Sequence, residues 1–105
     1  LFDNPAFNDF KGGLTENYVS NQLISNKFNS FYWTSGNQAE IDFIVRINHD
    51  ITPIEVKAGD NTRSKSLNEY IKRFNPEYAI RVSSKNFGFE NNIKSVPLYA
   101  AFCIK

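Results

Sequence analysis

Two alternating segments, separated by a short polar stretch, constrain the fold of this chain most strongly. Every second residue is apolar from Ala39 to Ile47, and the same period of two recurs within residues 51–58. Alternation of this kind is typical of β-strands with one buried face. The intervening Asn48-His49-Asp50 is rich in turn-forming residues, so we expect the two segments to pair as an antiparallel hairpin.

The flanking segments predict helices and further strands. In chain order we expect an irregular arm over residues 1–13, a helix over 14–27, an aromatic strand over 31–34, the two alternating strands, a helix over 67–74 with a Ser66–Glu69 capping box, a strand over 78–82, a polar loop around 87–89, and an apolar strand or buried helix over 96–104. A helix between two strands returns the chain parallel to the strand it left. The predicted class is therefore α/β (mixed α+β), a central mixed sheet with helices on both faces.

Length and composition limit the organisation of the chain. With 105 residues, 41% of them hydrophobic, the sequence fits one domain over residues 1–105. The single cysteine, Cys103, has no partner within the chain, which favours a reducing cytoplasmic setting and a thiol inside the core. The longest apolar run, Leu98–Ile104, is too short to span a membrane.

Two further features concern partners. The net charge is only +1, so any site for a polyanion has to be local rather than a property of the whole surface. The chain begins at Leu1 and contains no methionine. We therefore expect it to be the C-terminal fragment of a longer protein with a partner domain upstream.

Acids and one amine occupy the hairpin faces opposite the apolar stripes. Asp42 lies on that face of the first strand, and Glu55 and Lys57 lie on that face of the second. Two registers keep both apolar stripes on one core. In one, which pairs Arg46 with Ile51, the two acids stand opposite each other. In the other, shifted by two residues, Asp42 stands opposite Lys57, and either register brings the three side chains to within about 5–8 Å at their Cβ atoms.

Carboxylates brought together in this way need a positive charge, because at about 4 Å and an effective dielectric constant near 20 they repel by about 4 kcal/mol. Lys57 supplies one charge, and a hard divalent cation, Mg²⁺ or Mn²⁺, supplies two. Such a group suits phosphodiester hydrolysis, with Lys57 orienting or deprotonating the attacking water. Glu16 is predicted to join it, because on the first helix it lies within about 20° of Leu23 on the apolar face.

Each of these residues also has a simpler interpretation. The hairpin residues could form an ion pair on a solvated face, and Glu16 could be a favourable acid in the first turn of a helix. Glu40 is either a second ligand or merely exposed at the start of its strand. His49 is interpreted as a solvated turn residue rather than a general base.

Together these segments resemble the PD-(D/E)XK, or restriction-endonuclease-like, nuclease superfamily. Glu16 in the first helix, Asp42 within residues 39–43, and Ile54-Glu55-Val56-Lys57 carry the resemblance, although no proline precedes Asp42. More narrowly, the chain is similar to the uncharacterised C-terminal domain that follows AAA-type ATPases in many bacterial and archaeal proteins, on the residues of segments 14–17, 31–34, 40–43 and 53–59.

The resemblance covers residues 14–104 and implies a fold, a site and partners. It implies a restriction-endonuclease-like αβββαβ core, a catalytic site of Glu16, Asp42, Glu55 and Lys57, and Mg²⁺ or Mn²⁺ held by the three acids. It also implies DNA as the substrate and an N-terminal ATPase domain on the same polypeptide, with ATP bound only there. The alternative is a non-cleaving module of the same fold that binds DNA or protein, or dimerises, for that ATPase.

Basic and aromatic side chains elsewhere extend this hypothesis. Four basic residues in or before the second predicted helix could contact phosphates or simply form a solvated helix face, namely Arg63, Lys65, Lys72 and Arg73. Trp33 could stack on bases but is more typical of a core strand residue. Phe87 and Phe89, which flank Gly88 in a polar segment, are expected to form an interface.

Overall fold

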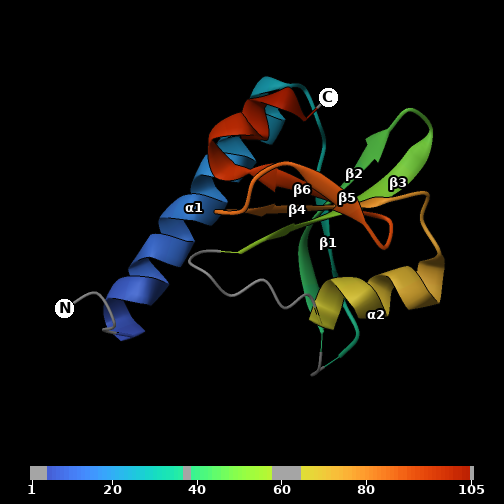
Figure 1. Ribbon diagram of the computed structural model, residues 1–105, viewed down its shortest axis with the longest axis horizontal. Helices are drawn as coiled ribbons and strands as arrows, with labels where there is room; N and C mark the ends of the chain where they lie inside the picture. The colour runs from blue at the N-terminus through green and yellow to red at the C-terminus, as the bar shows by residue number, and fades with distance from the viewer. Residues whose placement is uncertain (1–4, 37–38, 58–64, 105) are drawn as a thin grey trace.

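The computed structural model describes residues 5–36, 39–57 and 65–104, which form one mixed β-sheet with helices on both faces (Figure 1). The helices are α1 (Pro5–Ser25), α2 (Lys65–Phe74) and the 3₁₀ helix η1 (Leu98–Cys103), and the strands are β1 (Phe31–Thr34), β2 (Glu40–Ile47), β3 (Asp50–Val56), β4 (Ala79–Ser83), β5 (Gly88–Glu90) and β6 (Ile93–Pro97). The order across the sheet is β1-β2-β3-β4-β6-β5. Strand β4 is parallel to β3 and to β6, whereas the other neighbours are antiparallel. The predicted mixed sheet with a crossover helix is confirmed.

Helix α1 corrects the expectation of an irregular N-terminal arm. The helix begins at Pro5 and runs through Gly12 and Gly13, whereas the arm was expected to reach residue 13. Proline is favoured in the first turn of a helix, where its missing N–H costs nothing. A glycine inside a helix costs only about 1 kcal/mol, so this pair does not end it.

The buried face of α1 is narrower than the apolar residues of the helix would suggest. Thr15, Val19 and Leu23, each four residues apart, are buried, whereas Leu14 and Ile24 are exposed. This spacing places the buried side chains on one line along the helix. The helix ends in a Schellman motif, because Lys27 has a φ of 66° and the amide of Phe28 donates to the carbonyl of Leu23 at 2.9 Å.

The β2–β3 hairpin adopts one of the two registers left open by the sequence. Arg46 pairs with Ile51, and the ladder runs from Ile47–Asp50 to Phe43–Ile54. Asn48 and His49 form the two-residue turn with φ of 51° and 77°, as a type I′ turn requires. The second strand therefore begins at Asp50, one residue earlier than predicted.

Strand β2 breaks the predicted alternation with one extra residue. Phe31 of β1 pairs with Ile44, but Trp33 pairs with Ile41, so two steps on β1 match three steps on β2. This is the pattern of a β-bulge. The expectation that Ile41 shares a face with Phe43 is therefore wrong, because Ile41 packs with Ile44 in a different core cluster.

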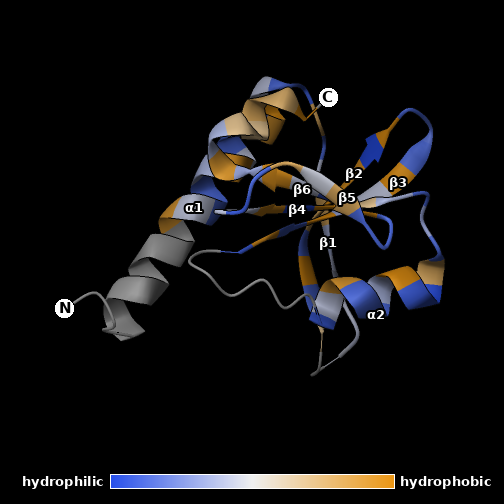
Figure 2. Ribbon diagram, in the orientation of Figure 1, coloured by the Kyte–Doolittle hydropathy of each residue, from blue (hydrophilic) through white to orange (hydrophobic). Residues whose placement is uncertain are grey.

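Two core clusters lie on the two faces of the sheet, as expected. Helices α1 and η1 cover one face, where Val19 and Leu23 meet strand residues such as Ile54. Helix α2 covers the other, where Leu67 and Tyr70 meet Ile41, and its alternating hydrophobic and hydrophilic bands are visible in Figure 2. In the parallel pairing of β3 with β4, each residue of β3 points to the same face of the sheet as its partner on β4.

The predicted capping box at the start of α2 is not formed. The helix begins at Lys65, so Ser66 lies inside the first turn rather than before it. The Ser66 hydroxyl instead accepts a hydrogen bond from the backbone N–H of Glu40 at 3.4 Å. The serine thus connects α2 to the first residue of β2.

The C-terminal part of the chain departs most from the prediction. Residues 88–90 form β5, an edge strand paired with β6, rather than a loop. The final segment is the 3₁₀ helix η1, whose Ala100 and Ala101 are buried while Cys103 is exposed. The expectation of a core thiol is therefore wrong, because one side of this short helix faces solvent. Within the described ranges, no helix combines the length and the apolar character needed to cross a bilayer.

Adjacent positions on α1 provide a direct test of this packing. Leu23 is 1% exposed and Ile24 is 67% exposed. We expect Leu23→Ala to lower the free energy of unfolding by about 2–5 kcal/mol and Ile24→Ala to change it by less than about 0.5 kcal/mol. Urea denaturation followed by circular dichroism measures both, and similar losses in the two variants would contradict the orientation of α1.

Candidate active site

Two acidic side chains from different elements meet at the start of β2. Glu16 of α1 and Asp42 of β2 share a side-chain hydrogen bond. Asp42 lies within the bulged part of β2, between Ile41 and Ile44. Because α1 packs on one face of the sheet, this contact turns Asp42 toward α1, whereas strict alternation predicted the opposite face.

The electrostatic surroundings favour a proton on Glu16. Partial burial raises the pKa of Glu16 above its ordinary value of 4.5, although Glu16 and Asp42 are both exposed residues. The hydrogen bond to Asp42 and the negative charges of Asp42 and Glu40 raise this pKa further. The negative charge of Asp42 opposes ionisation of Glu16, so Glu16 holds its proton more tightly than an isolated glutamate would.

A second pair lies at the end of β3. Lys57 places its Nζ 3.6 Å from Oε1 of Glu55, and the backbone N–H of Lys57 donates to the carbonyl of Val82 at 2.8 Å, which continues the pairing of β3 with β4. Glu55 is 8% exposed, and its Oε2 is buried with no hydrogen-bond partner within residues 5–36, 39–57 and 65–104. An unsatisfied buried group costs about 1–3 kcal/mol, and more when it is charged.

The Glu16–Asp42 pair and the Glu55–Lys57 pair are connected only through the backbones of β2 and β3. Asp42 and Glu55 are the next residues beyond Phe43–Ile54, where the ladder ends. Within the described part of the chain, no hydrogen bond or ion pair joins the Glu16–Asp42 pair to the Glu55–Lys57 pair. The same residues contain no group of three or more acids, histidines or cysteines arranged to hold a metal ion.

Arg81 is a candidate that the sequence interpretation missed. It stands directly opposite Glu55 in the parallel register of β3 and β4. The alternation of Ile80 and Val82, which pack in the α1-side cluster, places Arg81 on the other face. The alternation around Arg81 was visible in the sequence. To place Arg81 beside Glu55, however, one has to know which residue of β4 aligns with Glu55.

The remaining predicted residues lie apart from these pairs. Glu40 is exposed, and its charge reaches Glu16. His49 is exposed in the turn at the far end of the hairpin, seven residues along the chain from Asp42 and hence about 20 Å away. The turn interpretation of His49 is therefore confirmed.

The basic residues predicted to contact phosphates lie on α2 where they are described. Arg63 lies outside the described residues, and Lys65 and Lys72 are exposed. Arg73 is exposed as well, and its guanidinium lies 3.6 Å from Glu69 and 5.7 Å above the ring of Trp33.

Trp33 itself packs as a core residue rather than a free stacking surface. Its ring meets Tyr70 edge-on at 5.3 Å and Phe74 at 5.8 Å. Both partners lie on α2, so the simpler interpretation of Trp33 holds.

Comparison with known proteins places most of this chain in one family. Residues 11–101 match the family model described as Domain of unknown function (DUF4143). This range includes both pairs of candidate residues. No curated protein and no solved structure matched the chain.

The raised pKa of Glu16 can be measured directly. We expect its side-chain ¹³C resonance to titrate above 4.5 and Asp42→Asn to move the midpoint toward 4.5. The return should be partial, because burial is the largest cause of the shift. Glu69→Gln, on α2, is the matched control and should leave the midpoint unchanged.

The same shift predicts a pH dependence of stability. Folded Glu16 binds a proton more tightly than unfolded Glu16, so the free energy of unfolding should fall as pH rises from about 4.5 through the raised pKa. Glu16→Gln should remove this fall. An identical pH profile in wild type and variant would contradict the assignment.

Proposed function

We propose that this chain, which belongs to the DUF4143 family, is a divalent-metal-dependent phosphodiesterase of the PD-(D/E)XK nuclease type. It acts on DNA in the cytoplasm, beside an AAA-type ATPase domain of the same polypeptide. The observation that carries the proposal is the buried carboxylate of Glu55, which has Lys57 beside one oxygen and, in the part of the chain that the structure describes, no hydrogen-bond partner on the other.

The donor atoms of the two pairs are of the type that Mg²⁺ and Mn²⁺ prefer, although the described residues do not gather three of them at one point. Hard cations prefer carboxylate oxygens, and the Oε2 of Glu55 is such an atom, buried with no hydrogen-bond partner among the described residues. Asp42 and Glu16 supply further carboxylate oxygens, and the two side chains share a hydrogen bond. We propose that these three acids hold the cation, which when bound would make water more acidic and offset negative charge on a phosphate.

Lys57 has the position needed to act on water or phosphate. Its side chain is 30% exposed while its ammonium lies beside a carboxylate that is nearly buried. The amine therefore reaches solvent from a fixed location. In the proposed mechanism it orients the attacking water and stabilises the negative charge that develops on the phosphate.

Arg81 and Glu16 complete the proposed roles. Arg81, opposite Glu55, adds positive charge next to the buried acid. Glu16, whose pKa is raised by burial and by Asp42, holds a proton near the start of β2. A group with a raised pKa can give and take a proton closer to neutral pH than an ordinary carboxylate can.

A cleavage assay tests the proposal. Plasmid and branched DNA are incubated with the protein in Mg²⁺, in Mn²⁺ and in chelator, and the products are resolved on gels. We expect cleavage that depends on the metal and falls by about a hundredfold or more in Asp42→Asn, Glu55→Gln and Lys57→Gln.

His49→Ala and Glu69→Gln are the controls, since both residues are described away from the site. No cleavage by the wild-type protein under any condition, or equal cleavage by the site variants, would overturn the proposal. A metal-dependent rise in melting temperature that Glu55→Gln abolishes would separate loss of metal binding from loss of chemistry.

A different observation favours an assembly role as the second candidate. Strand β1 forms one edge of the sheet, and its Phe31 and Tyr32 are 71% and 67% exposed. Edge strands with exposed apolar side chains pair readily with other strands. We propose that a second copy of this chain would dock here, edge to edge across a two-fold axis.

Sedimentation equilibrium tests this second role. We expect a dimer in the wild-type protein and a monomer in Tyr32→Lys, because a charge on an edge strand opposes pairing. Tyr99→Lys is the matched control, since Tyr99 is 71% exposed on η1. A monomeric wild-type protein, or dissociation caused equally by the control, would remove this candidate.

A further inference from the structure

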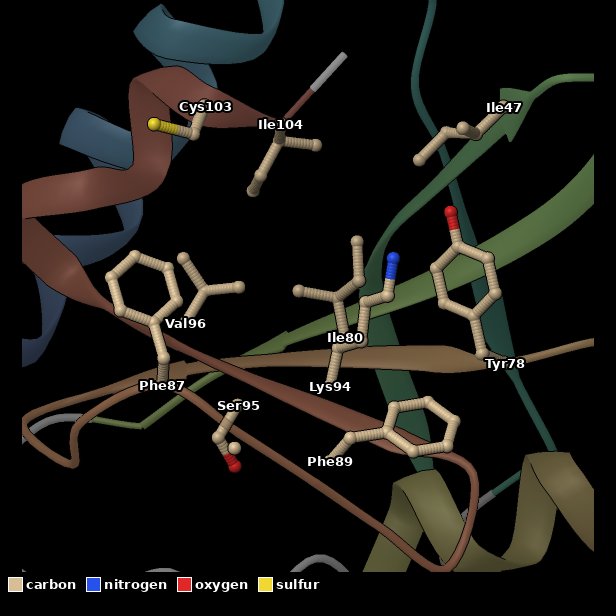
Figure 3. Close-up of a pocket in the computed structure, with 11 residues that line it drawn as sticks. Ile47, Tyr78, Ile80, Phe87, Phe89, Lys94, Ser95, Val96, Cys103 and Ile104 are labelled. Carbon is tan, nitrogen blue, oxygen red and sulfur yellow. The ribbon is translucent and has the colours of Figure 1, made fainter.

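A cavity of about 590 Å³ opens on the α1 and η1 side of the sheet, away from the acidic pairs (Figure 3). It lies over β4, β6 and β5 and is bounded on another side by η1. Its volume falls in the range of about 300–1,000 Å³ that is usual for small-molecule sites. Ile80, Val96, Ile104 and Phe87 provide most of its apolar wall.

The strand register explains both the cavity wall and its one charge. Residues Ile80 and Lys94 are partners in the parallel pairing of β4 with β6, as are Val82 and Val96. All four therefore project from the same face of the sheet. Three of them are apolar and belong to the α1-side core cluster, so Lys94 is a cation in an otherwise apolar row.

Lys94 has an aromatic partner but no acidic one among the described residues. Its Nζ lies 4.3 Å from the centre of the Tyr78 ring, a cation–π contact. No described acid lies within ion-pair distance of it. In Figure 3 the Lys94 ammonium and the Tyr78 hydroxyl lie close together in the cavity, while Phe87 lies at the other end.

The surroundings of Tyr78 limit the charge that a ligand can carry. Burial raises the pKa of Tyr78, and the negative charges of Glu77 and Asp50 raise it further. The phenol therefore stays protonated at neutral pH and remains a hydrogen-bond donor. The same two acids disfavour a ligand with several negative charges, such as a phosphate chain, because like charges repel.

We propose that this cavity binds a small carboxylic acid with one negative charge and an extended apolar body, a medium-chain fatty acid in chemical class. The carboxylate accepts hydrogen bonds from Lys94 and Tyr78. The apolar body lies along Ile80 and Val96 toward Phe87, with Ile104 of the opposite wall against it. The Glu16–Asp42 pair, the Glu55–Lys57 pair and metal ions take no part in this binding.

Binding of decanoate to the protein tests this inference, with decanol as the uncharged ligand of the same chain length. Both are titrated calorimetrically below the concentration at which decanoate forms micelles. We expect decanoate to bind the wild-type protein and to bind Lys94→Gln at least about tenfold more weakly, since a hydrogen bond to a charged group is lost. Lys85→Gln is the matched control, because Lys85 is an exposed lysine outside the cavity.

Methyl resonances locate the ligand independently of any variant. Decanoate should shift the methyl signals of Ile80 and Ile104, and leave that of exposed Ile24 unchanged. Circular dichroism verifies that Lys94→Gln is folded. Three results would each overturn the proposal: no binding of decanoate, equal affinity for decanoate in wild type and Lys94→Gln, or shifts confined to methyl groups outside the cavity.

Discussion

One extra residue in β2 controls how this molecule presents its acids. From Ile41 to Ile44, β2 advances by three residues while the paired segment of β1 advances by two. This bulge reverses the face of the sheet to which the side chains on one side of it point. Ile41 thereby joins Ile44 in the core under α2, and Asp42 reaches Glu16 on α1. Bulges commonly redirect a side chain next to a functional site. Without the bulge, Asp42 would face α2 and would not contact Glu16.

The sequence predicted the parts of the fold that depend on an unbroken period, and it failed where the period breaks. Keeping two apolar stripes on one core left two registers open, and the observed pairing of Arg46 with Ile51 is one of them. The bulge could not be derived from that argument, which assumes strict alternation. A signal was present nonetheless: Ile44 is an apolar residue in the middle of a polar stripe. Short elements were also missed, because three residues of β5 and a 3₁₀ helix leave little periodicity to detect.

The candidate site was predicted as one group of four residues and is observed as two pairs with different charge balance. In the first pair, the hydrogen bond to Asp42 and the negative charge of Asp42 raise the pKa of Glu16. An ammonium 3.6 Å away offsets only one oxygen of Glu55. The alternation of residues along the two strands placed all the acids near the open end of the hairpin. It could not show which positively charged group lies beside each acid. The difference matters for the proposed function, because the proposed cation site rests on the oxygen of Glu55 that has no hydrogen-bond partner among the described residues.

Parallel pairing keeps the proposed nuclease site and the proposed fatty-acid site apart. Lys57 follows the end of β3, whereas Tyr78 precedes the start of β4. Because these two strands run in the same direction, the end of one and the start of the other lie at opposite ends of the sheet. The two sites also differ in charge: among the described residues, one oxygen of Glu55 has no hydrogen-bond partner, and Lys94 has no acid within ion-pair distance. A dication would therefore be attracted to one end and a carboxylate to the other, so occupation of either site leaves the other chemically free.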